Sequence, residues 1–335
     1  MSKTPPRGRT SSLLASVALV FALASGGVTQ AADASDRSVA LGVSMYDGRQ
    51  MEALDSFTAS IGRTPATWSI WSRWGVASMR EFPATAAIAA KARGATPIIW
   101  WEPWGPNGHS DPTYARHANI IAGLHDAYIR QYARDARAFK SPIILRFAHE
   151  ANGPHFSWGR TGFDNTAASY VEAWRHIHRI FREEAADNVR FLWSVAKQSC
   201  PGRCNPYTVW YPGDAYVDYV GFSSFNWGAQ HDEWRSMLQG YRLVTELLSE
   251  ISAKPIIVVE SASNPEGGDK TAWIKEGYPA VHATLPAIVA IVYLNVDLRG
   301  SGHPDWRLTS PPAALDAYAD VAAMPEFQGR LPSGS

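Results

Sequence analysis

Residues 142–153, PIILRFAHEANG, decide how this chain folds and where its chemistry lies. Pro142 opens the stretch, the apolar run 143–145 is typical of a strand buried on both faces, and Asn152 with Gly153 predicts a turn. Glu150 is therefore expected where a strand leaves the core and becomes a loop. Burying a carboxylate costs free energy, so packing alone gives little reason for a glutamate there.

A second stretch repeats the pattern. Residues 255–260, PIIVVE, predict another buried strand that ends in Glu260. Two carboxylates at the ends of two parallel strands are what an acid/base and a nucleophile require. Arg146, four residues before Glu150 on the same strand, is a natural partner for Glu260. The alternative is that both glutamates form ordinary salt bridges.

Strands and helices alternate along the chain. The alternation predicts an α/β fold, a (β/α)8 TIM barrel in a single domain over 36–330, with its active site at the C-terminal ends of the strands. A doubly wound open sheet is the competing fold, but no glycine-rich phosphate loop follows the first strand. The predicted strands are 39–46, 67–71, 97–102, 143–145, 189–195, 218–225, 255–260 and 287–296, and the predicted helices are 51–61, 84–93, 114–139, 165–186, 232–252, 270–283 and 313–323.

Composition narrows the possible partners. The formal net charge is zero and 46% of the 335 residues are hydrophobic, which is enough for a large core. Nucleic acid is not expected as a partner, because phosphate binding needs clustered Lys and Arg. The chain has 14 tryptophans, and flat aromatic faces suit sugar rings, although many of these residues are expected to be core.

The N-terminus has the pattern of a secretory signal peptide, residues 1–31. Basic residues precede an apolar segment at 13–24, and small residues follow it. We expect cleavage after Ala31, with cleavage after residues 32 to 34 as alternatives. A membrane anchor is the other interpretation, but the apolar segment is too short to span a bilayer. We therefore expect a secreted protein, extracellular or periplasmic, with no membrane attachment after cleavage.

Two cysteines, Cys200 and Cys204, lie in a turn-rich segment. In an oxidising compartment they predict a local disulfide, with free thiols as the alternative. So short a loop would add about 2 kcal/mol of stability. No metal site is predicted, because His176 and His178 are two residues apart and face different sides of their helix.

The residues 146–153, followed by FSWG at 156–159, resemble the acid/base motif of glycoside hydrolase family 26, a β-mannanase-like family. The resemblance runs along nearly the whole chain after the signal peptide. It includes PIIWWEPW at 97–104, YPGD at 211–214, YVDYVG at 216–221, FNWG at 225–228, KPIIVVE at 254–260 and DWR at 305–307.

The resemblance implies a retaining (β/α)8 glycosidase that needs no cofactor. It implies Glu150 as the acid/base and Glu260 as the nucleophile, with Arg146 and His149 supporting them by hydrogen bonds. The expected substrate is a polysaccharide or oligosaccharide, first of all β-1,4-mannan cleaved in endo fashion by a monomer. The alternatives are β-1,3-1,4-glucan, a bacterial exopolysaccharide, or a weakly active polysaccharide-binding or biosynthesis accessory protein.

Three residues depart from the family pattern. His155 stands where many members have tryptophan, Phe225 replaces a tyrosine that contacts the nucleophile, and Tyr293 stands where tryptophan is expected. Each is expected near the subsite of the scissile sugar. Loss of the tyrosine hydroxyl is expected to cost about 1–3 kcal/mol in the transition state.

Aromatic residues beside strand ends are candidates for stacking on sugars, and core packing is the alternative for each. They are Trp104, Trp158, Trp227 and Trp306, and Asn226 is expected to contact the substrate beside Trp227. Glu102 ends a predicted strand, and a substrate contact and a supporting role are both open for it.

Overall fold

A computed structural model describes residues 1, 37–46, 48–108, 111–197, 206–231 and 233–331. Residues 34–335 form one compact unit, which is the part analysed below. The predicted signal peptide and the predicted disulfide between Cys200 and Cys204 lie outside the described residues, so both remain predictions. Within the described ranges, no helix is both long and apolar enough to cross a membrane.

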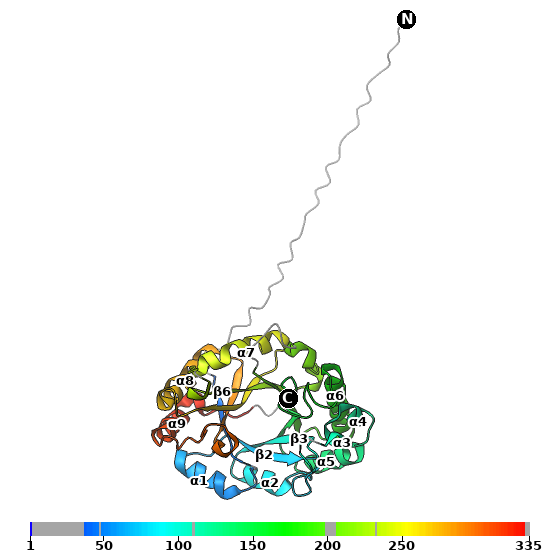
Figure 1. The fold of residues 1–335 in the computed structure, drawn as a ribbon, viewed down its shortest axis with the longest axis horizontal. Helices are drawn as coiled ribbons and strands as arrows, with labels where there is room; N and C mark the ends of the chain where they lie inside the picture. Colours follow the sequence, from blue (N-terminus) through cyan, green and yellow to red (C-terminus); the bar gives the residue numbers. More distant parts are fainter. Residues whose placement is uncertain (2–36, 47, 109–110, 198–205, 232, 332–335) are drawn as a thin grey trace. The chain divides into compact units, whose positions relative to one another are not determined.

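The predicted barrel is confirmed. The strands pair in parallel and in sequence order, and β8 closes the ring by pairing with β1. Figure 1 shows helices surrounding these strands. The strands are β1 (Ala40–Ser44), β2 (Thr67–Arg73), β3 (Thr96–Glu102), β4 (Ile143–Phe147), β5 (Val189–Ala196), β6 (Tyr219–Asn226), β7 (Ile256–Ser263) and β8 (Ile288–Leu294).

The prediction of one long helix over 114–139 was wrong. Three helices occupy this region, and Gly123, with a left-handed φ of 81°, lies between the second and the third. The α-helices of the described part are α1 (Met51–Ile61), α2 (Ala84–Ala92), α3 (Pro112–Ala115), α4 (His117–Ile121), α5 (Asp126–Ala138), α6 (Ala167–Glu183), α7 (Met237–Ile251), α8 (Lys270–Thr284) and α9 (Ala313–Ala323).

Side chains fill the barrel from inside and outside. Alternate strand residues such as Ile98, Ile144 and Ile257 form the inner cluster, and Leu331 packs against this cluster. The bridge between Gln328 and Ala40 joins the last described residues to the start of β1. These contacts cover the N-terminal end of the barrel, so the C-terminal ends of the strands, the barrel mouth, are left for a site.

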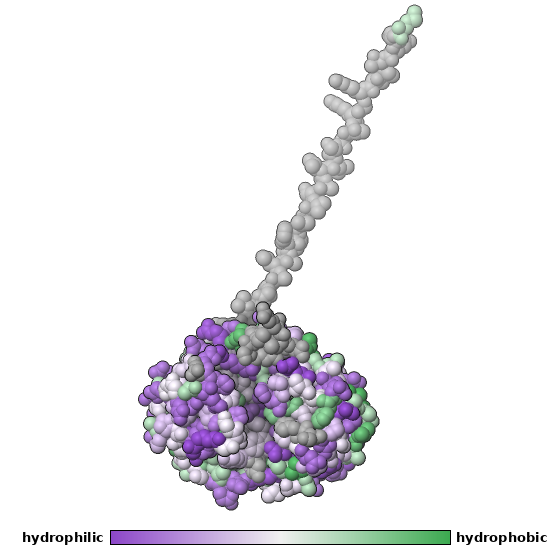
Figure 2. Space-filling view, viewed as in Figure 1, coloured by the Kyte–Doolittle hydropathy of each residue, from purple (hydrophilic) through white to green (hydrophobic). Residues whose placement is uncertain are grey.

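The outer layer packs the helices onto the strands. Trp101 of β3 faces outward, where its ring contacts Tyr132 of α5 and Phe181 of α6 at centroid distances of 4.7 and 5.7 Å. On the face drawn in Figure 2, hydrophilic side chains predominate and apolar ones are scattered among them. On this face, the apolar side chains of the outer layer are therefore mostly buried against the core.

The two glutamates sit differently relative to their strands. Strand β4 ends at Phe147, so Glu150 follows it in the loop, as predicted. Strand β7 continues to Ser263, so the prediction that it ends at Glu260 was wrong. The reason is that residues 261–263 continue to pair with β6.

Candidate active site

Arg146 is the centre of the site. It lies on β4 and is fully buried, with 0% of its surface exposed. Its Nη1 donates to Oε2 of Glu260 at 3.0 Å, and its Nη2 lies 3.8 Å from Oε1 of Glu150. Its Nε donates to Ser194 Oγ at 2.9 Å, and its Nη2 donates to Ser223 Oγ at 3.1 Å. One guanidinium therefore contacts both carboxylates and two strand hydroxyls.

The ring of Trp100 also stabilises the buried charge of Arg146. The guanidinium carbon of Arg146 lies 4.3 Å from the ring centroid of Trp100, its register partner on β3. A planar guanidinium can stack on an aromatic face and still donate from its edge, which an ammonium cannot do in the same way. A buried ion pair is tolerable when its remaining donors are bonded, as they are here.

Glu260 is nearly enclosed, with 9% of its surface exposed. Burial raises the pKa of its carboxyl to about 7, and the negative charge of Glu150 adds to the rise, whereas Arg146 and the Ser223 hydrogen bond oppose it. At neutral pH the group is thus poised between its two protonation states. A carboxylate beside a cation and a hydroxyl donor is suited to serve as a nucleophile when ionised.

The loop that carries Glu150 is held in an unusual backbone conformation. Ala148 and Glu150 have positive φ values of 39° and 55°, which non-glycine residues rarely adopt. The Glu150 amide donates to the Ser194 carbonyl at 3.0 Å, and the Asn152 side chain exchanges two 2.9 Å hydrogen bonds with the backbone of Ala196. Strain fixed by such contacts is characteristic of functional sites.

His149 supports the site through packing. Its ring lies 5.3 Å from that of Trp100 and 4.5 Å from that of Phe156, and its carbonyl accepts a 2.8 Å hydrogen bond from Trp158 Nε1. Burial, and to a smaller extent the positive charge of Arg146, holds the pKa of His149 well below its usual range. Within the described residues the imidazole makes no hydrogen bond with either carboxylate, contrary to the expected support by hydrogen bonding.

Two tryptophans expected to stack on sugars are core residues. Trp158 is 0% exposed, with Phe156 stacked on it at 4.6 Å. Trp306 is 2% exposed, and its ring packs 5.2 Å from Phe225 and 5.3 Å from Trp227. Each therefore backs another aromatic residue and does not offer a face of its own to a sugar.

Two further residues that were expected to contact the substrate, Asn226 and Tyr293, make their contacts within the protein. The Asn226 amide donates to Ser263 Oγ at 2.9 Å, and its Oδ1 accepts from the Arg235 amide at 3.0 Å, so this side chain joins the ends of β6 and β7 to the next loop. Tyr293 faces outward from β8, with its ring 5.8 Å from that of Tyr318 on α9. The expectation that Tyr293 lies at the scissile sugar was wrong for this reason.

Some expected aromatic contacts remain available. Trp104, Phe225 and Trp227 are partly exposed, and His155, which follows Glu150 in its loop, is exposed. The guanidinium of Arg73 lies 5.0 Å from the Trp104 ring. Trp104 follows β3, while Phe225 and Trp227 lie at the end of β6, so aromatic surface is present on two sides of the mouth.

The structure adds residues that the sequence did not single out. Trp71 of β2 makes an edge contact with Trp100 at 5.1 Å, and Arg73 donates to Oε2 of the buried Glu102 at 2.8 Å. Burial raises the pKa of Glu102, and Arg73 opposes the rise. The strand period of two was the available signal, because Glu102 lies two residues after Trp100, the register partner of Arg146, and therefore shares its inward face.

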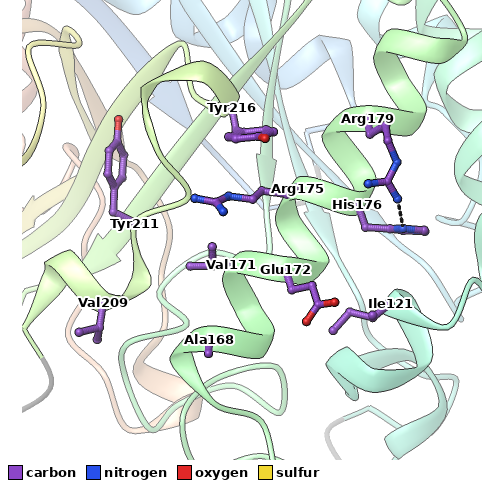
Figure 3. A pocket seen from close by; sticks show the side chains of 10 residues that line it. All are labelled: Ile121, Ala168, Val171, Glu172, Arg175, His176, Arg179, Val209, Tyr211 and Tyr216. Carbon is purple, nitrogen blue, oxygen red and sulfur yellow. Dashed lines mark hydrogen bonds between the residues drawn. The ribbon is translucent and has the colours of Figure 1, made fainter.

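A cavity of about 560 Å³ lies away from these residues, on the outer side of α6 (Figure 3). Arg175, His176 and Arg179 come from that helix, and Arg175 Nε donates to the Pro212 carbonyl at 2.8 Å. The cavity contains neither Glu150 nor Glu260. Within the described ranges, no group of three or more His, Cys, Asp or Glu residues could hold a metal ion.

Known proteins are similar to this chain in sequence and in fold. Residues 110–275, which contain both glutamates, match the sequence profile of glycosyl hydrolase family 26. Endoglucanase H of Acetivibrio thermocellus is 36% identical over 240 residues, covering 70% of this chain and 25% of that protein. A mannan endo-1,4-β-mannosidase of Bifidobacterium adolescentis is 24% identical over 233 residues, covering 64% of this chain and 22% of that protein. The chain thus spans about a quarter of the length of each of these two relatives.

Solved structures agree on the fold. The β-mannanase BoMan26A of Bacteroides ovatus superposes with a TM-score of 0.65 at 16% identity, covering 88% of this chain and 91% of that one. The mannanase man26 of Bacillus subtilis gives a TM-score of 0.61 at 20% identity, covering 85% of each chain. The sequence profile, the relatives and the shared barrel lead to one conclusion: the chain belongs to glycosyl hydrolase family 26.

Proposed function

We propose that this protein is a retaining endo-β-glycanase that hydrolyses a β-linked polysaccharide, with Glu150 as the acid/base and Glu260 as the nucleophile. The observation that carries the proposal is the Arg146 guanidinium, which contacts both carboxylates at the barrel mouth. In retaining enzymes the two carboxyl groups lie about 5–5.5 Å apart, closer than in inverting enzymes. Two carboxylates gathered by one guanidinium are consistent with the closer spacing.

In the first step, protonated Glu150 gives its proton to the glycosidic oxygen as the bond from that oxygen to the anomeric carbon breaks. Ionised Glu260 attacks the anomeric carbon and forms a glycosyl ester. The Arg146 hydrogen bond holds the attacking carboxylate in place and stabilises its charged form before attack.

In the second step, a water molecule replaces the departed sugar. Glu150, now ionised, takes a proton from this water, and the water oxygen attacks the anomeric carbon. The ester bond to Glu260 breaks, which restores the carboxylate and releases a sugar with the original anomeric configuration. The loop geometry of Glu150, tied to β5 through the Ser194 carbonyl, supports both proton transfers from one position.

The two relatives compared above divide the substrate candidates between glucan and mannan. The sequence motifs favour β-1,4-mannan, whereas the 36% identical relative is an endoglucanase. Phe225 and His155, both at or beside the mouth, differ from the mannanase pattern and support β-glucan as a second candidate. Trp71, Trp104 and Trp227 are partly exposed, and their rings are suited to stack on either chain.

The test is reducing-end release from glucomannan, galactomannan, barley β-glucan, xylan and a bacterial exopolysaccharide. Glu260→Ala serves as the blank, and Glu266→Ala, a change at an exposed glutamate beyond β7, is the matched control. Release that vanishes in Glu260→Ala and persists in the control supports the proposal. Binding of a glycan without release from any of them would overturn it and favour the accessory-protein alternative.

We further propose that the protein is exported, with cleavage after Ala31. Its catalytic domain spans residues 36–330 and acts as a monomer. The basic and apolar pattern of the N-terminus supports export. Mass spectrometry of the protein recovered from culture medium and periplasm tests the cleavage site, and light scattering tests the oligomeric state. An uncleaved chain in the cell membrane would contradict the export proposal.

A further inference from the structure

A shift in strand register brings Ser223 opposite the proposed nucleophile. Phe222 of β6 pairs with Val258 of β7, but the next residue, Ser223, pairs with Glu260, so Val259 is skipped. An extra residue of this kind re-aims the side chains beyond it. Ser223 and Glu260 consequently face each other inside the barrel mouth.

The direction of the Ser223 hydrogen bond follows from its two neighbours. A guanidinium can only donate, so the 3.1 Å contact from Arg146 Nη2 makes Ser223 Oγ an acceptor. The single hydroxyl proton of Ser223 is then directed to Oε2 of Glu260 at 3.0 Å. Because Ser223 is 4% exposed, water competes little for this proton.

The two oxygens of Glu260 are therefore not equivalent. Oε2 accepts from both Arg146 Nη1 and Ser223 Oγ, each at 3.0 Å. Among the described residues, no hydrogen bond reaches Oε1. A carboxylate held through one oxygen leaves the other oriented for bond formation.

We propose that Ser223 is a positioning residue that, with Arg146, fixes Oε2 of Glu260 so that Oε1 is the oxygen that attacks the anomeric carbon. This inference rests on the proposed function. In this role Ser223 supplies the nucleophile with a hydroxyl donor from β6. Phe225, two residues later on the same strand, has no hydroxyl to donate. Because Ser223 donates to Glu260, the nucleophile stays oriented although position 225 lacks the tyrosine hydroxyl.

The neighbouring serine provides a matched control. Ser224 is 3% exposed, but its Oγ points to the other face of β6 and donates to the Gly240 carbonyl of α7 at 3.2 Å. Ser224→Ala therefore removes one buried hydroxyl from the same strand without touching Glu260. Ser223→Ala removes the positioning hydroxyl, and Ser223→Cys replaces it with a nearly isosteric but weak S–H donor.

The experiment measures kcat and KM on the most active glycan for the wild type and the three variants, together with pH profiles and melting temperatures. We expect Ser223→Ala and Ser223→Cys to lower kcat roughly 10- to 100-fold with little change in KM, since a hydrogen bond to a charged group is lost. Ser224→Ala should keep the kcat of the wild type.

The pH profile separates positioning from general stability. The charged groups that face Glu260 are Arg146 and Glu150, and both remain in the variants. Because the Ser223 hydrogen bond favours the ionised carboxylate, its loss should move the acid limb of kcat/KM to higher pH. Equal kcat and an unmoved acid limb in a folded Ser223→Cys protein would overturn the inference. An inactive wild type would instead refute the proposed function itself.

Discussion

Replacing Arg146 with lysine tests how much of the site depends on the fork of the guanidinium. Arg146 donates hydrogen bonds of 2.9, 3.0 and 3.1 Å to groups on three different strands. A lysine keeps the positive charge but carries it as a single point on a flexible stem, so it cannot reach all three acceptors. At least one hydrogen bond to a charged group is then lost or lengthened, and such bonds contribute about 1.5–3 kcal/mol each.

If that free energy is lost from the transition state, Arg146→Lys should lower kcat roughly 10- to 100-fold, because each 1.4 kcal/mol is about a factor of ten in rate. KM should change less, since Arg146 is buried beneath the mouth and has no surface to offer a sugar. The assay is initial-rate reducing-end release, with the melting temperature measured on the same preparation.

Arg175→Lys is the matched control for this prediction. Arg175 lies on α6 and donates to the Pro212 carbonyl outside the barrel mouth. Its replacement should leave kcat unchanged. A folded Arg146→Lys protein with kcat within about threefold of the wild type, a difference of less than 1 kcal/mol, would show that catalysis does not depend on the guanidinium fork.

Three other outcomes follow from the site and the core. Since burial raises the pKa of Glu260 to about 7 and the nucleophile must be ionised, the acid limb of kcat/KM should rise with pH up to about pH 7, and a full rate at pH 5 would contradict this. Phe225→Tyr should change kcat less than about threefold, because Ser223 already donates to the nucleophile; a larger gain in the same rate assay would argue against that role. His117 is buried against the Trp158 carbonyl, and burial lowers its pKa to about 4, so as the pH falls the unfolded chain binds a proton at a higher pH than the folded protein does. The free energy of unfolding should therefore fall by about 3 kcal/mol between pH 6.5 and pH 4. Urea denaturation of His117→Gln should show a smaller fall.

The barrel was predictable from the sequence because its signal is repeated. Each predicted strand is a short apolar run bounded by turn residues, and alternation with helical segments leaves few possible folds. The positions of Arg146 and Glu150 follow from the same pattern, since residues that close a parallel strand meet at one end of the sheet. The single helix predicted over 114–139 was wrong because Gly123, where the helix breaks, resembles in sequence a glycine that a helix tolerates.

The remaining errors concern the direction of side chains. A strand that is apolar on both faces carries no period-two signal, so the sequence does not tell that Tyr293 faces α9 and not the mouth. Trp158 and Trp306 are buried by the folding of their own loops, which local sequence does not specify. The placement of Ser223 depends on a one-residue register shift between β6 and β7, and that shift exists only in the assembled sheet.

In the proposed mechanism, Glu260 forms a covalent bond with the sugar. The direct measurement is mass spectrometry of peptides after incubation with a 2-deoxy-2-fluoro-β-glycosyl fluoride of the preferred sugar, which slows hydrolysis of the ester more than its formation. We expect one added glycosyl group on the peptide that contains Glu260, and none in Glu260→Ala. A glycosyl group on another residue, or turnover of natural substrate that first releases the inverted anomer, would contradict it.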